Sequence, residues 1–298
     1  MSATGIRIGT RGSALALAQA ALVRDALLAA GRSTRVVVIE TEGDRRAPDT
    51  AWGEGAFVAA IEGALLDGRV DLAVHSAKDI PTDEPPGLRI AAYLPRADAR
   101  DALVVRADSA VRSIDDLPTG SRVGTDSPRR TGFLRARRPD LVVHPLHGNV
   151  DTRLRRLAAG ETDALILACA GLDRLGLSER IAERLPTDVV PPAAGQGAIA
   201  VQIRIDDDWL LDALAAIDDR PTRLAVEAER SFLHAMGGGC RAPIGAHATV
   251  DGDRLDLLGA NLAIDTAMPV FRRRQSGSGD PAEAGRMLAA EMAPGATA

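Results

Sequence analysis

A sequence pattern that occurs twice does most to limit how this chain can fold. Residues 6–10 are typical of a strand that ends in Gly-Thr and leads to Ser13 at the start of a helix, and residues 122–127 repeat that order up to Ser127. Further along each copy, a Gly-x-x-Asp sequence that ends at Asp71 or Asp163 precedes an apolar run. The repeat predicts two similar α/β domains.

The segments between these motifs alternate between strand and helix patterns. We expect a helix over 13–30, a strand over 34–40, a helix over 56–67 and a buried strand over 71–76. Strands that are joined by helices usually run parallel and are buried on both faces. The sheet is therefore predicted to be mostly parallel.

Two proline-containing stretches, 94–100 and 191–197, are predicted to cross between the domains, and a pair of crossovers indicates a hinged cleft. After the glycine run at 237–239, three strand-like runs and a helix near 281–292 predict a small α+β domain. We therefore expect an α/β protein with two similar doubly wound lobes and a third α+β domain, divided as 1–94 with 198–218, 95–197, and 219–298.

Composition and charge argue against several classes of protein. The chain has 298 residues, of which 46% are hydrophobic and 26% charged, as is typical of a globular protein with several domains. A net charge of -5, one tyrosine and two tryptophans disfavour general nucleic-acid binding. The apolar stretches are too short for a membrane span, and the N-terminal residues do not resemble an export signal. Two cysteines without Cys-x-x-Cys spacing favour a reducing compartment, so we expect a cytoplasmic protein.

Basic residues gather around both Gly-Thr turns. Parallel sheets bind ligands at the carboxyl ends of their strands, where a helix N-terminus presents unpaired N–H groups to an anion. Arg11 lies beside the first turn, and Arg129 and Arg130 lie beside the second. Ser13 and Ser127 have a simpler explanation as helix N-caps, which applies to most serines at such positions. Together with the guanidinium groups, two facing helix N-termini predict a receptor for carboxylates or phosphates.

One lysine stands out in a chain that otherwise uses arginine. Lys78 is the only lysine among the 36 lysines and arginines, and it precedes Asp79 just beyond the predicted strand 71–76. A titratable pair at the end of a buried strand would face the predicted cleft. The ordinary alternative is a surface ion pair at a strand end.

Other basic residues give weaker signals. Arg153, Arg155 and Arg156 cannot all face one way, because helix residues one apart point in different directions. We therefore expect only some of them to face a ligand. His144 and His147 alternate imperfectly along a strand, and no third residue has convincing ligand spacing, so no metal site is predicted.

The two cysteines lie in very different sequence contexts. Cys240 is part of the loop Gly237-Gly-Gly-Cys-Arg-Ala-Pro-Ile-Gly245, whose glycines allow the backbone to approach a bulky ligand, so this thiol could carry an attached group. Cys169 ends an apolar run, and we expect it to be buried and inert. Neither a P-loop nor a Gly-x-Gly-x-x-Gly motif follows the first strand, so no nucleotide cofactor is predicted.

Five motifs together resemble the porphobilinogen deaminase family. They match in order and spacing over about residues 5–245, and their combination is specific although each motif alone is weak. The region from residue 250 onward resembles the family only in its size and its strand and helix character. The motifs are Thr10-Arg-Gly-Ser-Ala-Leu-Ala-Leu17 with Gln19, His75-Ser-Ala-Lys-Asp79, Gly124-Thr-Asp-Ser-Pro-Arg-Arg130, Gly148-Asn-Val-Asp-Thr-Arg153 and Gly239-Cys-Arg-Ala-Pro-Ile-Gly245.

The resemblance implies a fold and an activity. Its first two domains would be like the lobes of type II periplasmic binding proteins, and the third would carry the cofactor cysteine. The activity would join four porphobilinogen molecules head to tail into hydroxymethylbilane with release of ammonia, in tetrapyrrole biosynthesis. A monomer would act on this small-molecule substrate, primed by a dipyrromethane cofactor that Cys240 holds through a thioether bond.

The resemblance also assigns roles to individual residues. Asp79 would be the catalytic group. The remaining positions would bind the carboxylates of the cofactor or the substrate. The implied cofactor-binding residues are Cys240, Lys78, Ser13, Thr125, Ser127, Arg129, Arg130 and Arg153, and the implied substrate-binding residues are Arg11, Arg174, Gln196 and His147.

Three features depart from the family's usual pattern. His147 stands where the family commonly has an arginine before Gly-Asn, which changes one expected carboxylate contact. Asp126 adds a negative charge inside a turn that is expected to bind anions. The loop at 41–55 carries Glu42 and Glu54 and no lysine, whereas some relatives have basic residues there.

Two other functions remain open on the residues alone. A non-enzymatic protein that binds or senses small anions could use the same two-lobed fold, although the loop around Cys240 would then have no obvious task. An RNA-binding protein could use the arginines between 129 and 156, but its binding would fall steeply with salt and would not need Cys240.

Overall fold

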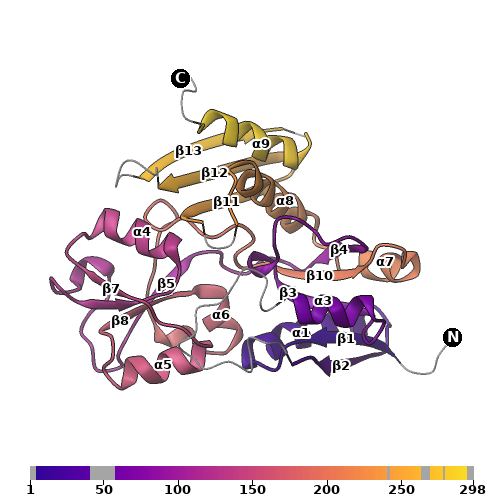
Figure 1. Cartoon of the computed structure of the whole chain (residues 1–298), viewed down its shortest axis with the longest axis horizontal. Helices are drawn as coiled ribbons and strands as arrows, with labels where there is room; N and C mark the ends of the chain where they lie inside the picture. The colour runs from indigo at the N-terminus through magenta and orange to yellow at the C-terminus, as the bar shows by residue number, and fades with distance from the viewer. Residues whose placement is uncertain (1–4, 41–57, 240–241, 263–268, 278, 294–298) are drawn as a thin grey trace.

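The computed structural model describes residues 5–40, 58–239, 242–262, 269–277 and 279–293. In this part of the chain, the strands form two five-stranded sheets and one three-stranded sheet. Figure 1 shows the two larger sheets side by side, with the three-stranded sheet above them.

The first lobe is a five-stranded sheet with helices on both faces. Its elements are β1 (Ile6–Thr10), α1 (Ala14–Ala29), β2 (Thr34–Val38), α3 (Ala59–Leu66), β3 (Leu72–Ser76), the 3-10 helix η1 (Ala77–Asp79), β4 (Leu88–Tyr93), β10 (Ile199–Arg204) and α7 (Asp208–Ala215). The strand order is β2-β1-β3-β10-β4. Leu27 of α1 packs with Ile8 on one face, and Ile61 of α3 packs with Ala73 on the other. Burial of both faces holds the carboxyl ends of β1 and β3 in fixed positions.

The second lobe has the same plan. Its elements are β5 (Asp101–Val105), η2 (Ile114–Asp116), β6 (Arg122–Gly124), α4 (Pro128–Arg137), β7 (Val142–His144), α5 (Val150–Ala158), β8 (Ala164–Ala168), α6 (Cys169–Arg174), η3 (Ser178–Arg180) and β9 (Ile181–Arg184). The strand order is β7-β6-β8-β5-β9. Phe133 of α4 packs with Val123 on one face, and Leu157 of α5 packs with Leu165 on the other.

The repeat in the sequence corresponds to an arginine–aspartate ion pair that occurs at the same place in both lobes. In the first lobe, the backbone N of Arg7 lies 2.7 Å from Asp71 Oδ2, and its Nη2 lies 2.5 Å from Oδ1. In the second lobe, the backbone N of Arg122 lies 2.8 Å from Asp163 Oδ2, and its Nη2 lies 3.0 Å from Oδ1. The pair joins β1 to the start of β3 in the first lobe and β6 to the start of β8 in the second, so the prediction of two similar α/β lobes is confirmed.

The prediction of a mostly parallel sheet is wrong for half of the strand pairs. In the first lobe, β1 pairs in parallel with β2 and β3, whereas β10 is antiparallel to both β3 and β4. In the second lobe, β5 is likewise antiparallel to β8 and β9. Both reversed strands enter their sheet from a crossover, so the chain arrives from the opposite lobe and runs against its neighbours.

A smaller unit packs above the two lobes (Figure 1). Its elements are α8 (Arg220–Ala235), β11 (Ile244–Asp251), β12 (Arg254–Leu262), β13 (Pro269–Ser276) and α9 (Pro281–Glu291). The three strands are antiparallel in the order β11-β12-β13, and α8 and α9 cover one face, where Phe232 is fully buried. Gly259 allows this packing, because a Cβ there would come within 2.6 Å of the Phe232 ring. The predicted α+β region is confirmed.

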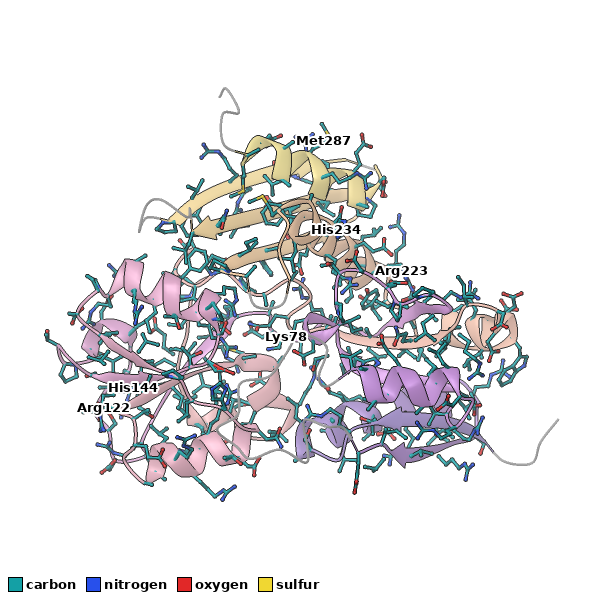
Figure 2. The ribbon with its side chains drawn as sticks, viewed as in Figure 1. Lys78, Arg122, His144, Arg223, His234 and Met287 are labelled. Atoms are coloured by element: carbon teal, nitrogen blue, oxygen red, sulfur yellow. The ribbon has the colours of Figure 1, made fainter. Side chains whose placement is uncertain are left out.

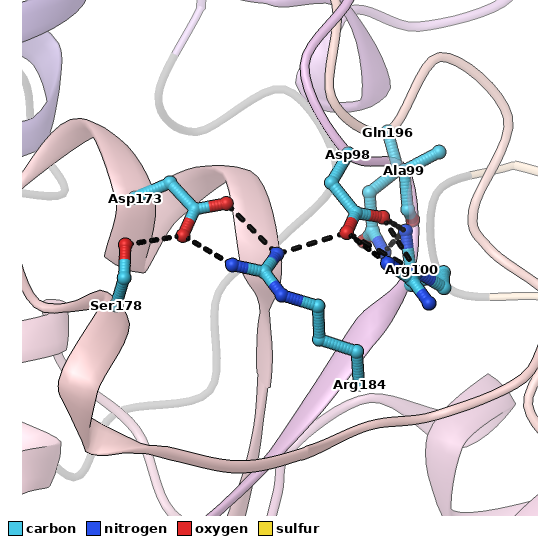
Figure 3. Close-up of polar contacts among 7 residues, drawn as sticks. All are labelled: Asp98, Ala99, Arg100, Asp173, Ser178, Arg184 and Gln196. Carbon is cyan, nitrogen blue, oxygen red and sulfur yellow. Dashed lines mark hydrogen bonds and ion pairs between the residues drawn. The ribbon is translucent and has the colours of Figure 1, made fainter.

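The first crossover is fixed at two points. Arg96 donates to Glu229 of α8 at 2.6 and 3.0 Å, and Glu229 is fully buried. Two residues later, Asp98 accepts a hydrogen bond from Arg184 of β9 at 2.8 Å, and Arg184 also pairs with Asp173 of α6 (Figure 3). These contacts hold the chain between the lobes against both the second lobe and the smaller unit. Within the described residues, no helix is long and apolar enough to cross a membrane.

Candidate active site

A cavity of about 660 Å³ lies between the two lobes. Its wall includes the end of β3 at Ser76 and the end of β8 at Ala168, together with the second crossover at Ala193 and Gln196. Figure 2 places Lys78 in this region, between the lobes and beneath the smaller unit. The predicted cleft therefore lies at the carboxyl ends of corresponding strands in the two lobes.

Three helices point their N-termini toward the cavity. Ser13 caps α1, where its Oγ accepts a hydrogen bond from Ala16 N at 3.3 Å, and Ser127 caps α4, where its Oγ accepts from Arg130 N at 3.4 Å. Asn149 is the residue before α5, and all three starting residues line the cavity. The N-cap interpretation of the serines is confirmed, and the three helix N-termini still favour an anion at this wall.

Two arginines that the resemblance assigned to carboxylate binding already have a buried carboxylate partner. Arg129 lies 2.8 Å and Arg130 2.7 Å from the fully buried Asp101 at the start of β5. Arg129 also donates to the Pro191 carbonyl, and Arg130 donates to the Ile166 carbonyl at 3.0 Å. Burial by itself raises the pKa of Asp101, but the two guanidinium groups more than offset this, and the pKa lies far below its ordinary value. Two cations share one anion, so this wall keeps a positive charge.

Lys78 is connected to that cluster through Gln196. Its Nζ donates to Gln196 Oε1 at 3.1 Å, and Gln196 Nε2 donates to Asp101 Oδ1 at 2.9 Å. The chain of hydrogen bonds runs from the first lobe through the second crossover to the second lobe. Burial and the charge of Arg130 lower the pKa of Lys78 to about 8. The surface ion-pair alternative for Lys78 is therefore wrong, because its hydrogen-bond partner is the fully buried amide of Gln196.

The remaining basic residues of the predicted site do not all reach the cavity. Arg11 and Arg153 line it, and Arg153 Nε donates to the Gly148 carbonyl at 2.8 Å. Burial lowers the pKa of Arg153 to about 10, which leaves it charged at neutral pH. Arg174 is not a lining residue, and its Nη2 donates to the Gly197 carbonyl at 2.6 Å.

The other two arginines of α5 and the buried Thr125 lie away from the cavity lining. Arg155 is exposed and Arg156 pairs with Glu161 at 2.7 Å, so the expectation that these helix arginines face different ways is confirmed. Thr125 is buried, and its Oγ1 accepts a hydrogen bond from Ser127 N at 3.3 Å. This contact shapes the turn before α4.

Asp79 and His75 both lie near the carboxyl end of β3, but Asp79 is exposed and His75 is buried. Asp79 is exposed at the cavity wall, directly after Lys78. His75 lines the cavity but is only 4% exposed, and burial lowers its pKa to about 4, so the ring is neutral at pH 7. Its Nε2 is buried and has no hydrogen-bond partner among the described residues. One carboxylate and one neutral imidazole are thus available to a ligand.

His147 contacts a residue of the cavity wall instead of lining the cavity itself. Its Nδ1 lies 2.6 Å from Asp126 Oδ2, and the two side chains are 13% and 16% exposed. Asp126 lines the cavity, whereas His147 does not. The two departures from the family pattern noted in the sequence are therefore direct partners.

The two cysteines differ in what the structure describes. Cys169 is fully buried, and burial raises its pKa to about 12, so the prediction of an inert thiol is confirmed. Cys240 and the loop at 41–55 lie outside the described residues. Downstream of Cys240, Ala246 N donates to the Pro192 carbonyl at 2.9 Å, and Ala193 lines the cavity. The strand that follows Cys240 is therefore anchored beside the cavity.

Sequence reasoning missed Asp101, which organises the basic wall. An aspartate that opens a fully buried strand needs a cationic partner, and that placement was the available signal. The described residues contain no group of three histidine, cysteine, aspartate or glutamate side chains that could hold a metal ion.

Comparison with known proteins identifies the family. Residues 6–212 match the model described as "Porphobilinogen deaminase, dipyromethane cofactor binding domain", and residues 223–294 match "Porphobilinogen deaminase, C-terminal domain". The chain belongs to the porphobilinogen deaminase family. Porphobilinogen deaminase of Roseiflexus castenholzii is 50% identical over 292 residues, which cover 96% of this chain and 95% of the relative. The family member from Mycobacterium leprae is 46% identical over 297 residues, with 96% and 94% covered.

Solved structures that align with this chain share little sequence with it. The second substrate binding domain of a putative amino acid ABC transporter from Streptococcus pneumoniae is 14% identical, with a TM-score of 0.46 and coverage of 72% of this chain and 92% of that one. The VFT2 domain of Bordetella pertussis BvgS is 19% identical, with a TM-score of 0.42 and coverage of 71% and 85%.

Proposed function

We propose that this chain is a hydroxymethylbilane synthase, which condenses four porphobilinogen molecules into a linear tetrapyrrole with release of ammonia. The observation that carries the proposal is the cavity between the lobes, where a basic wall faces the exposed carboxylate of Asp79. Family membership supplies the reaction, and the cavity contains the charges that the reaction needs.

The basic wall suits the carboxylates of the substrate. Each porphobilinogen carries an acetate and a propionate group, so a growing chain accumulates negative charge. Lys78, Arg11 and Arg153 line the cavity, and Arg129 and Arg130 together exceed the charge of Asp101 by one. Guanidinium groups bind carboxylates in a two-pronged geometry, so several arms can be held at once.

Asp79 has the position and the charge for the bond-breaking step. We infer that its carboxylate accepts a hydrogen bond from the pyrrole N–H and stabilises the cation that forms when the carbon–nitrogen bond breaks and ammonia leaves. A new carbon–carbon bond then forms when a free pyrrole α-carbon attacks the methylene carbon, and the attacking α-carbon loses its proton. A carboxylate fixed beside a delocalised cation lowers its energy without moving.

The cavity also suits a dipyrromethane cofactor attached to Cys240. Carboxylates of such a group match the donors of Ser13, Ser127, Lys78 and the arginine wall, and the strand after Cys240 is anchored beside the cavity at Pro192. When bound, this group supplies the free pyrrole α-carbon that attacks the substrate. The protein's own contribution is to hold its carboxylates and to keep its reactive end near Asp79.

We propose that the individual residues have the roles that the resemblance implies, except that some of them act indirectly. Thr125 and Arg174 act by shaping the turn before α4 and the second crossover, because neither lines the cavity. Gln196 orients Lys78. The cofactor contacts are assigned to Cys240, Lys78, Ser13, Ser127, Arg129, Arg130 and Arg153, with Thr125 acting through the turn before α4. The substrate contacts are assigned to Arg11 and Gln196, with Arg174 acting through the second crossover and His147 through Asp126.

The domain division and the setting are also proposals. We place the boundaries at 94/95, 197/198 and 218/219, so that each crossover separates the two lobes. We propose a cytoplasmic monomer without nucleic-acid partners. The net charge of -5 and two cysteines that lack Cys-x-x-Cys spacing support this proposal. Light scattering of the purified protein measures the oligomeric state directly.

Intact mass tests the function together with the cofactor site. The wild-type protein should exceed its sequence mass by two porphobilinogen units less two ammonia, and Cys240→Ser should lose this increment. Cys169→Ser is the matched control, because it removes the other cysteine of the chain and should keep the increment. An unmodified wild-type protein that converts porphobilinogen at full rate would exclude the proposed attachment.

A further inference from the structure

Asp126 and His147 form a hydrogen-bonded pair at the wall of the cavity, although 20 residues separate them in the sequence. His147 Nδ1 lies 2.6 Å from Asp126 Oδ2, and neither side chain is more than 16% exposed. An ionised carboxylate only accepts hydrogen bonds, so the imidazole is the donor and its proton lies on Nδ1.

The second oxygen of Asp126 has no hydrogen-bond partner among the described residues. Asp126 Oδ1 is buried, and it accepts no hydrogen bond from the described residues. A buried carboxylate oxygen without a donor is costly, unless a ligand supplies the donor. Asp126 also lines the cavity, so its carboxylate lies at the wall that a bound molecule contacts.

The charges around Asp126 narrow the choice of ligand group. Arg130 and Arg153 also line the cavity, but within the described part of the chain neither forms an ion pair with Asp126 at 4.0 Å or less. Asp126 repels the acetate and propionate arms, which these arginines attract. The group that a carboxylate attracts on porphobilinogen is its aminomethyl substituent, a primary ammonium with three N–H donors.

We propose that Asp126 recognises the aminomethyl ammonium of the incoming porphobilinogen and that His147 positions Asp126 for this contact. The inference rests on the proposed function and adds a specificity residue to the same site. His147 holds Oδ2 and so restricts rotation of the carboxylate, which leaves Oδ1 for a donor from the ligand. Asp126 thereby places one negative charge among the basic side chains of the wall. This charge orients the substrate with its carboxylate arms toward the arginines.

Two substrates separate this role from a structural one. The test compares porphobilinogen with its hydroxymethyl analogue, which has the same carboxylate arms but a neutral leaving group. Asp126→Asn should raise KM for porphobilinogen about 10- to 100-fold, the range expected when one hydrogen bond to a charged group is lost. KM for the analogue should stay the same or fall, because the variant removes a negative charge from a wall that binds carboxylates. An equal rise of KM for both substrates overturns the assignment.

A control variant tests whether any nearby negative charge has the same effect. Asp151 also lines the cavity, but it is exposed and lies 3.7 Å from Arg155. Asp151→Asn should change the ratio of the two KM values less than about 2-fold, because exposed ion pairs contribute little. A change in this ratio as large as that of Asp126→Asn would overturn the specific role of Asp126.

Variants of His147 test the positioning role. His147→Asn retains an N–H donor near the place of Nδ1 and should keep most of the discrimination, whereas His147→Leu should lose it. In Asp126→Asn, the further change His147→Leu should have little additional effect on KM, because His147 acts only through Asp126. Independent, additive effects would overturn the link between the two residues.

Intact mass separates this inference from the proposed function. Asp126→Asn should still carry the two-pyrrole increment, since Asp126 is assigned to the incoming substrate. If the wild-type protein releases no ammonia from porphobilinogen, the proposed function fails. If the wild type is active but Asp126→Asn affects both substrates equally, only the assignment of Asp126 fails.

Discussion

Replacing Asp101 with asparagine should destabilise the protein more than any exposed charge change. The residue is fully buried, with guanidinium nitrogens of Arg129 and Arg130 at 2.8 and 2.7 Å. Asparagine keeps the shape but leaves two buried cations without an anion. Removing one partner of a buried ion pair costs about 3–5 kcal/mol. At roughly 2–4 °C per kcal/mol for a chain of this size class, the melting midpoint should fall by about 6–20 °C.

The assay is thermal unfolding followed by circular dichroism, with Asp115→Asn as the matched control. Asp115 and Arg137 also lie 2.8 Å apart in the second lobe, but both are more than half exposed, so this change should shift the midpoint by less than about 2 °C. The Asp101 pKa lies far below its ordinary value, so its stabilisation is present at neutral pH and is lost as pH falls below about 4. Equal midpoints for the two variants at pH 7 would refute the reasoning.

Three further changes test other parts of the site. Binding of a methyl analogue of porphobilinogen should weaken as pH rises through about 8 while the Lys78 ammonium deprotonates, and Lys78→Arg should abolish this dependence in calorimetric titrations. Asp79→Asn should lower kcat at least about 100-fold without a shift of the melting midpoint, because Asp79 is exposed, whereas Asp83→Asn should leave kcat unchanged. Glu229→Gln should lower the free energy of unfolding by about 3–5 kcal/mol in urea titrations, because it leaves Arg96 without its buried anion.

The two-lobed fold could be predicted from the sequence because the pattern that produces each lobe occurs twice. Arg7 and Asp71 occupy the same positions in their repeat as Arg122 and Asp163, and the same ion pair forms in both lobes. The direction of β10 and β5 could not be predicted in this way. Their direction depends on the lobe from which each crossover arrives, and periodicity within a strand carries no information about that.

The residues of the candidate site could be predicted from the sequence, but the contacts among their side chains could not. The arginines at 129 and 130 were expected to be open to ligand carboxylates, whereas Asp101 binds both. No pattern links these positions, because they meet only when β5 enters the second sheet beside β8. The contact between Asp126 and His147 was hidden for the same reason, since it joins two turns at the ends of neighbouring strands.

The use of arginine at every basic position except Lys78 has a physical consequence. Burial lowers the pKa of Arg153 to about 10, and at neutral pH this guanidinium remains charged. Burial also lowers the pKa of Lys78 to about 8, so this ammonium group begins to lose its proton close to neutral pH. An arginine wall therefore holds a constant charge while carboxylates accumulate, and Lys78, with its lowered pKa, can give up a proton near pH 8. Its position next to Asp79 places that adjustable charge beside the carboxylate proposed to stabilise the reacting cation.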